Sequence, residues 1–308
     1  MWNFSLLKAL ALWGRLVPLM AARLFVFGLG AVALGVAMAI GVWAGGRLGL
    51  MGGANDAVLG GLAGLLLAAG ILGVFGRARV RAMQSQLIAL ISDMLGGVRV
   101  PMGQGQVAHA RSTVAARFGS AAQLQSIHRF VRGVSGRVAA TGEGVAPLLA
   151  LPILGRLLTG GLVDQMVLAH AYRARPENAW EATHDGLVLA TQNAHELLGN
   201  AFRINGIGWL LTLAAFLFLL PPFVAFAALV PLLGPASGAI AAGLAALAVR
   251  SALIQPFVLA CQLQAFRRIT AGQQPLGEWR GRLTQISTLF RELGDRAIGW
   301  APETGSNA

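Results

Sequence analysis

The stretch from Ile204 to Val249 contains no charged side chain, and it restricts the chain more than any other feature of the sequence. A helix that crosses the roughly 30 Å hydrocarbon core of a bilayer needs about 20 apolar residues. This stretch and the residues after it are therefore long enough for two crossings, which we predict over Gly206–Val230 and Gly238–Ala260. A short turn rich in proline and glycine joins them.

The composition indicates the same class of protein. Of the 308 residues, 56% are hydrophobic and only 12% are charged, and the mean hydropathy is +0.67, outside the range of ordinary soluble domains. The net charge of +12 would suggest nucleic acid as the partner of a soluble protein. Here the arginines flank apolar runs, where they set orientation and contact lipid headgroups. We predict an integral membrane protein that contacts anionic headgroups of the lipid bilayer and binds no nucleic acid.

The N-terminal part has the pattern of a membrane hairpin. Residues 1–23 mix aromatic, leucine and basic residues, which predicts a helix in the headgroup region. Leu24–Ala44 is too long for the core of a signal peptide, so we expect it to remain as a first span, with Ala57–Gly76 as a second. Residues 24–76 then form a first transmembrane hairpin, and residues 206–266 form another.

Small residues are frequent in the first hairpin, and they predict close helix packing. Apolar side chains gain little by leaving lipid for another helix, so helices associate where small residues let their backbones approach. The glycines expected to serve this purpose are Gly28, Gly35, Gly60 and Gly64. The pattern favours packing within the chain over dimerisation, and it leaves a homo-oligomer or a larger membrane complex open.

The distribution of charge predicts the orientation. Three basic residues precede the first span and three arginines closely follow the second, whereas the loop between these spans holds only Arg47 and Asp56. Loops with an excess of lysine and arginine stay on the cytoplasmic side. We therefore predict a multi-pass protein of the prokaryotic inner membrane with both termini in the cytoplasm.

The segment between the hairpins, residues 77–205, is basic and helical in pattern. Over 107–138, apolar residues repeat at helical spacing with arginines among them. This favours a basic amphipathic helix on the inner leaflet over the solvated face of a cytoplasmic helical layer. Residues 145–171 have an uncharged core too short to span, so we expect them to re-enter or lie on the membrane. For residues 267–308 we predict a cytoplasmic amphipathic helix and a disordered tail.

Arg250 is the leading candidate for function because it lies near the middle of the fourth predicted span. A charge at that depth is costly unless it faces a polar cavity or a partner, so such arginines often mark a substrate pathway or an anion site. The alternative is an arginine that extends its guanidinium to the membrane surface. Gln255 continues the polar character beyond it.

Two further groups of residues could belong to such a pathway. Pro221 and Pro222 remove two backbone donors from the third span, so we expect the helix to kink or break there, as in transporters with broken helices. The alternative is a kink with a structural role alone. The polar residues before this span could cap it or line its mouth, and they are Asn200, Arg203 and Asn205.

No pattern in the sequence indicates catalysis or a cofactor. Glu181 and His184 place two potential metal ligands on one helix face, but the second such pair of a di-iron bundle is missing, so we predict no metal. The Walker loop, the G-x-S-x-G elbow and the H-E-x-x-H motif are absent. The single cysteine, Cys261, excludes an intramolecular disulfide. We therefore expect a protein that is not an enzyme.

Several segments between residues 104 and 268 follow one another in a familiar order, and they are Val107–Arg111, Leu162–Ala171, Ala182–Gly186, Asn200–Asn205 and Gln255–Cys261. In pattern and spacing this part of the chain resembles the C-terminal half of the choline-transporter-like family. The resemblance implies a helical membrane transporter of organic cations such as choline. This chain is shorter, and its spans show no aromatic cluster suited to a quaternary ammonium ion, so we transfer the architecture and no binding residues.

These features predict an all-α, polytopic membrane protein with four transmembrane helices in two hairpins and with interfacial amphipathic helices. We expect a small-solute or lipid-related transporter or a channel subunit, with Arg250 and the Pro221-Pro222 pair at its pathway. The alternative is a non-catalytic scaffold or accessory subunit of a larger membrane complex.

Overall fold

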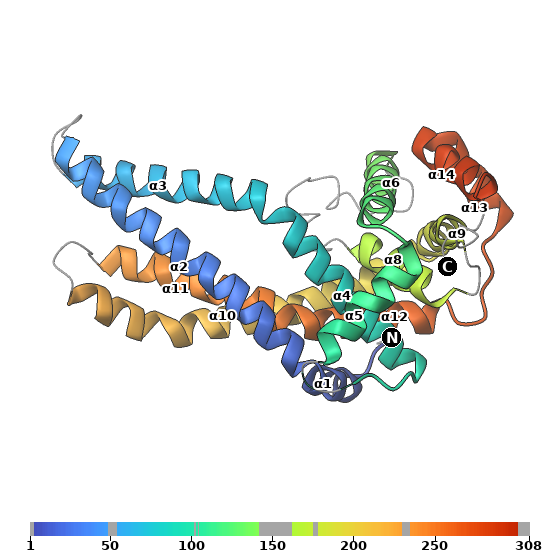
Figure 1. The fold of residues 1–308 in the computed structure, drawn as a ribbon, viewed down its shortest axis with the longest axis horizontal. Coiled ribbons are helices and arrows are strands. Elements are labelled where there is room, and N and C mark those ends of the chain that lie inside the picture. The colour runs from blue at the N-terminus through green and yellow to red at the C-terminus, as the bar shows by residue number, and fades with distance from the viewer. Residues whose placement is uncertain are drawn as a thin grey trace, which may run out of the picture. The chain divides into compact units, whose positions relative to one another are not determined.

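The computed structural model describes residues 3–48, 54–101, 103, 105–141, 162–174, 178–229 and 235–300. Every regular element in these ranges is a helix, which confirms the all-α prediction (Figure 1). The chain forms two compact units. Unit 1 comprises Met1–Arg15, Ser85–Gly206 and Phe257–Ala308, and unit 2 comprises Leu16–Gln84 and Ile207–Pro256.

Four helices in the described residues are long and apolar enough to cross a membrane, and their apolar ranges are Val17–Arg47, Asp56–Phe75, Ala194–Ala228 and Ala236–Ile269. This confirms the prediction of a polytopic helical membrane protein. The elements that form these spans are α2 (Val17–Leu48), α3 (Ala54–Phe75), α10 (Ala194–Ala228), α11 (Pro235–Val249), the π-helical η2 (Arg250–Ile254) and α12 (Gln255–Ile269).

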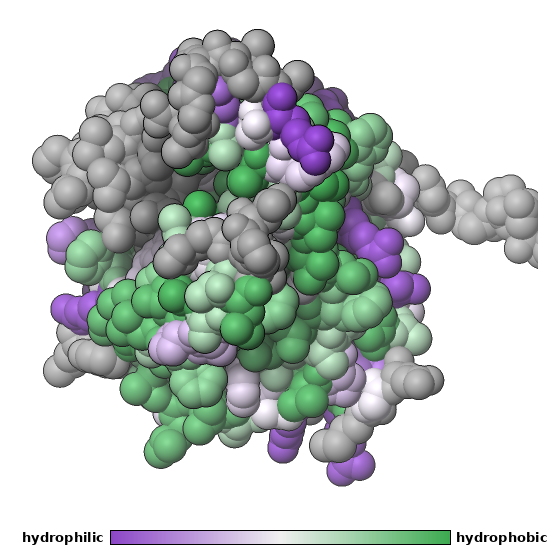
Figure 2. Space-filling view, turned by 90° about the vertical axis from the view of Figure 1, so that its left-hand side faces the viewer, coloured by the Kyte–Doolittle hydropathy of each residue, from purple (hydrophilic) through white to green (hydrophobic). Residues whose placement is uncertain are grey.

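Large apolar side chains on these helices are exposed and do not form a core. Phe75 of α3 and Phe218 of α10 are each 80% exposed. Hydrophobic residues also cover most of the described surface in Figure 2, which shows the left-hand side of Figure 1, where α2 and α10 end and α3 and α11 begin. Exposed apolar surface on this scale requires lipid or another protein to cover it.

α10 runs through Pro221 and Pro222 without a break. A proline removes one backbone hydrogen bond and crowds the carbonyl four residues earlier, but helices in lipid tolerate it when the rest of the ladder holds. Both proline rings are exposed. Of the two predicted outcomes, a kink or a break, the break therefore does not occur.

A seam of glycines joins α2 to α3. A Cβ atom added at Gly60 would lie 2.1 Å from the carbonyl oxygen of Gly41, and one added at Gly64 would lie 2.3 Å from the carbonyl oxygen of Ala37. A Cβ atom at Gly45 would lie 2.2 Å from the carbonyl oxygen of Asp56. The two backbones therefore touch, and the seam depends on the absence of side chains.

The four glycines predicted to pack helices divide into two pairs. Gly60 and Gly64 lie in the seam within the chain. A Cβ atom added at Gly28 or Gly35 would meet no atom within 4 Å. Only the first pair therefore has a packing role among the described residues.

Unit 1 is a set of packed helices in which α8 (Leu162–Arg173) and α9 (Ala179–Gln192) are largely buried against each other. Around this pair lie α6 (Ala121–Thr141), α13 (Gly277–Ile286) and α14 (Thr288–Ile298). The unit also contains α1 (Leu6–Arg15), α5 (Gly105–Phe118), most of α12 and the greater part of α4 (Arg77–Gly96).

The basic segment 107–138 forms two helices whose apolar side is covered by protein. Gly119, with φ of 62°, lies between α5 and α6. Ile127, Val131 and Val134 of α6 are at most 1% exposed, and α6 packs against α8, α9, α13 and α14. A helix on the inner leaflet would turn these residues to lipid. The structure instead matches the alternative interpretation of a helical layer.

The C-terminal amphipathic segment is also two helices, where the sequence predicted one. The Ser287 hydroxyl accepts a hydrogen bond from the Phe290 N–H at 3.3 Å, so Ser287 is the N-cap of α14 and ends α13. The part of segment 145–171 before Leu162 lies outside the described residues, as does the predicted disordered tail from residue 301 on. The described part, in α8, is buried in unit 1.

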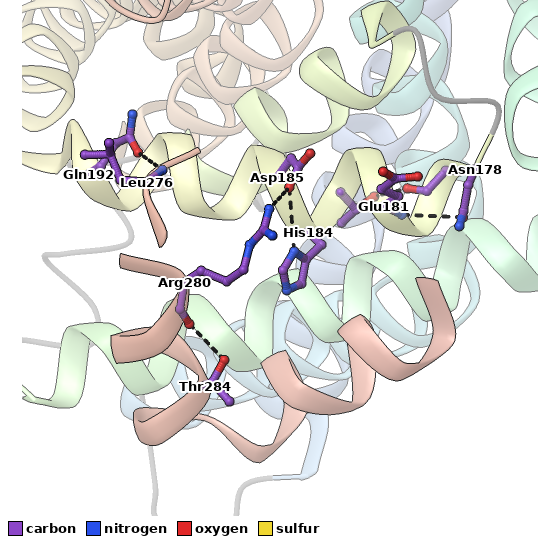
Figure 3. Close-up of polar contacts among 10 residues, drawn as sticks. Asn178, Glu181, His184, Asp185, Gln192, Leu276, Arg280 and Thr284 are labelled. Atoms are coloured by element: carbon purple, nitrogen blue, oxygen red, sulfur yellow. Dashed lines mark hydrogen bonds and ion pairs between the residues drawn. The ribbon is translucent and has the colours of Figure 1, made fainter. Parts of the chain in front are cut away.

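Polar contacts hold the C-terminal helices to α9 (Figure 3). Arg280 donates a hydrogen bond to Asp185 at 2.8 Å, and His184 stacks on Phe290 with ring centroids 4.2 Å apart. Burial would raise the pKa of the Asp185 carboxyl, but His184 and Arg280 outweigh it and hold this pKa below its usual value. No group of three His, Cys, Asp or Glu side chains in the described ranges could hold a metal ion.

The glycine seam predicts a position-dependent response to a single methyl group. Gly60→Ala should destabilise the protein by about 1–3 kcal/mol, because the methyl group forces two backbones apart. Gly70→Ala, on the same helix with no atom within 4 Å of its added Cβ, should be neutral or stabilise by up to about 1 kcal/mol. Thermal unfolding of both variants in detergent micelles measures the difference, and equal effects would contradict the seam.

Candidate functional site

The candidate site lies at Arg250, the first residue of η2. In this segment the backbone hydrogen bonds join residues five apart, and the N–H of Gln255 donates to the carbonyl of Arg250. Short π-helical segments inside α-helices occur often at functional sites. Here the segment joins α11 to α12 and sets the direction in which the Arg250 side chain leaves the helix.

The Arg250 guanidinium lies against α10. Its Cζ atom is 3.9 Å from the centroid of the Trp209 ring, and its Nη1 donates a hydrogen bond to the Thr212 hydroxyl at 2.9 Å. The Thr212 hydroxyl in turn donates to the carbonyl of Gly208 at 2.7 Å. The ring face and the hydroxyl attract the cation but do not neutralise it. Arg250 has no carboxylate partner within the described ranges.

A groove leads away from this cation between α10 and α11. Its volume is about 410 Å³, and its lining is almost wholly apolar. Trp209 and Thr212, the two residues that hold Arg250, form part of the wall. The other lining residues are Leu213, Phe216, Ile240, Gly243, Leu244, Ala246 and Leu247.

The groove exists because the two helices approach closely at only one end. At Gly238 an added Cβ atom would lie 2.7 Å from the carbonyl oxygen of Phe223, so the backbones nearly touch there. Farther along, Phe216 and Trp209 of α10 line the groove, and Gly243 of α11 opposes Phe216 without a side chain of its own. The result is an apolar groove, two of whose lining residues, Trp209 and Thr212, contact the Arg250 guanidinium.

A second arginine, Arg23 of α2, forms hydrogen bonds to the backbone of η2. It is 2% exposed. Its Nη2 and Nε donate to the carbonyl of Ser251 at 2.7 and 3.3 Å, and its Nη2 also lies 3.5 Å from the Gln84 amide oxygen of α4. Arg23 therefore links α2 and α4 to the residue directly after Arg250.

The Ser251 carbonyl needs this donor because of the local sequence. In an α-helix the donor to Ser251 would be the N–H of Gln255, but that group is bonded to Arg250. In π-helical register the donor would be residue 256, which is proline and has no N–H. A buried carbonyl without a donor costs about 1–3 kcal/mol, and Arg23 removes this cost.

Of the other residues predicted for a pathway, Gln255, Pro221 and Pro222 lie in unit 2 with Arg250. The side chain of Gln255 is partly exposed, and the Gln255 backbone closes η2. Pro221 and Pro222 are not among the groove-lining residues. In unit 1, Asn200 is buried and accepts a hydrogen bond from the N–H of Asn3 at 3.2 Å, so it fixes the N-terminal segment. The remaining two in that unit are Arg203, which is exposed, and Asn205, which is buried.

Sequence reasoning missed Trp209, Thr212 and the role of Arg23. The signal for Thr212 was weak, since it is a single hydroxyl in an apolar run. Arg23 was counted as one of the basic residues that set orientation, because nothing local distinguishes it from its neighbours. Comparison of the chain with protein-family models, curated proteins and solved structures finds no match.

A double-mutant cycle tests the contact behind η2. Arg23→Met removes the donors to Ser251, whereas Pro256→Ala supplies a backbone N–H that can replace them. We expect Arg23→Met to cost on the order of 1 kcal/mol less in the Pro256→Ala background than in the natural sequence. Unfolding in mixed micelles measures each free energy. Strictly additive effects would show that Arg23 does not serve this carbonyl.

Proposed function

We propose that this integral membrane protein is a transporter, or a transporter subunit, that recognises a negatively charged solute at Arg250. A single observation carries the proposal. Arg250 lies in a predicted span, and its partners in the described residues are a neutral ring and a neutral hydroxyl that both line a groove. A solute anion would supply the missing charge.

The position of Arg250 along its helix supports this proposal. At about 1.5 Å of rise per residue, Arg250 lies roughly 22 Å from Pro235 at the start of α11. A hydrocarbon core of about 30 Å that begins at Pro235 would contain Arg250 in its far third. An ion at that depth loses much of its hydration, so an attraction between opposite charges is stronger there than in water.

The sign of the charge also decides between substrate classes. The choline-transporter-like resemblance implies an organic cation as the substrate, and Arg250 would repel a cation. The proposal therefore keeps transport from that resemblance and replaces the cation by an anion. The placement of both termini in the cytoplasm of a prokaryote continues as a prediction from the distribution of basic residues.

A structural role is the second candidate, and Gly28 and Gly35 favour it. They lie seven residues apart on α2, which puts them on similar faces of that helix, and neither has a neighbour where its Cβ atom would be. A scaffold or accessory subunit could use this face to approach a helix of another protein. This candidate predicts a partner that copurifies at a fixed ratio in mild detergent.

Flux in reconstituted liposomes tests the transport proposal. With fluorescent phosphatidylglycerol and a panel of small organic anions as probes, the natural protein should move at least one probe faster than protein-free liposomes do. Arg250→Gln should lower that rate by about tenfold or more, since a hydrogen bond to a charged group contributes about 1.5–3 kcal/mol.

The matched control is Arg47→Gln. Arg47 also lies over a tryptophan ring, that of Trp43 at 5.5 Å, but it is exposed at the end of α2 and lines no described groove. Its replacement should leave the rate unchanged. An equal loss in both variants, or no flux of any probe, would overturn the proposal.

A further inference from the structure

We infer that the groove between α10 and α11 binds an anionic phospholipid, with its phosphate on Arg250 and part of one acyl chain between the two helices. The inference rests on the proposed function and names the class of its substrate. It follows from the two chemical halves of the site, a cation at one end and an apolar channel continuous with it.

The apolar half favours a lipid over a small hydrated anion as the natural ligand. The lining of the groove is almost wholly apolar, so a hydrated solute would lose its water without replacement. An acyl chain has no such cost, since it exchanges one apolar surface for another. The shape is also suited to a chain, because the lining residues include four positions on each helix at i, i+3, i+4 and i+7, which extend over about 10 Å.

The polar half selects a phosphate over a neutral headgroup. One N–H of Arg250 is directed to Thr212, and its remaining donors have no partner in the described residues. A guanidinium matches the geometry of phosphate oxygens, with which it forms paired hydrogen bonds. Trp209 beneath the guanidinium keeps it at the mouth of the groove and fixes its plane.

Two positions determine whether a chain fits. Gly243 lies opposite Phe216, with 3.9 Å between an added Cβ atom and the ring edge. Alanine would be accommodated there, whereas leucine would fill the space that the chain needs. Gly243→Leu therefore removes the apolar half of the site and leaves Arg250 with its two partners.

Native mass spectrometry of the full chain in detergent micelles tests the inference, with phosphatidylglycerol and phosphatidylcholine as the two probes. The natural protein should retain phosphatidylglycerol in preference to phosphatidylcholine. Arg250→Gln and Gly243→Leu should each weaken phosphatidylglycerol binding about tenfold, the first through charge and the second through exclusion of the chain.

The matched control is Gly70→Leu. Gly70 lines a second apolar groove of about 340 Å³ on α3, whose lining residues include no cation, and its replacement should leave phosphatidylglycerol binding unchanged. If Gly243→Leu does not fold, Phe216→Ala provides a milder test, because it removes one wall of the groove and should weaken binding several-fold. An equal loss in Gly70→Leu would show that the retained lipid is only an annular one.

Soluble glycerol phosphate separates this inference from the proposed function. If Arg250 binds glycerol phosphate and Gly243→Leu has no effect on lipid retention, the acyl-chain site is refuted and anion recognition stands. If phosphatidylglycerol binding depends on both positions but no probe crosses liposomes, the lipid site stands and transport is refuted. If the natural protein retains phosphatidylglycerol and phosphatidylcholine equally, the lipid site is refuted.

Discussion

The hydrogen bonds from Arg23 to the Ser251 carbonyl are the contact on which the centre of unit 2 depends. In a bilayer no water is available to a free carbonyl, so every one must find a donor within the protein. Pro256 removes the donor that the backbone would have offered. The guanidinium replaces it from α2, and because it also reaches Gln84 of α4, one side chain connects three elements.

Arg23 and Arg250 therefore have different roles in unit 2. Arg23 is buried, and its donors are directed to backbone and amide oxygens. Its guanidinium therefore supplies the hydrogen bond that the backbone of η2 lacks. Arg250 is only partly buried, and its contacts are a ring and a hydroxyl that leave its charge unopposed. A lysine could not replace Arg23, because one ammonium lacks the planar spread of donors that reaches both Ser251 and Gln84. The hydrogen bonds of Arg23 complete the backbone of η2, whereas those of Arg250 leave most of its guanidinium donors without a partner in the described residues.

The sequence alone predicted the helical class and the spans, because a long uncharged run has few other uses. It also identified Arg250 from the cost of a charge in lipid. It could not find Trp209 as the partner of Arg250, since that contact joins residues far apart in the chain and has no local pattern. The seam at Gly60 was predictable from residue size. The lack of atoms near an added Cβ at Gly28 and Gly35 depends instead on where α3 lies. The segment 107–138 was assigned to the leaflet, because an apolar face looks the same in the sequence whether lipid or, as in α6, protein covers it.

The glycines of unit 2 show how one residue type produces opposite results in two helix pairs. Along α2 and α3, Gly41, Gly45, Gly60 and Gly64 recur at spacings that keep them on the same face, so the backbones touch over several turns and leave no space. Between α10 and α11 the backbones approach closely at Gly238, while beyond it Phe216 and Trp209 line a groove. Gly243 then lies beside open space and not against a backbone. Glycines that face a backbone join α2 to α3 without a gap, whereas the large side chains that line the space between α10 and α11 leave a groove there.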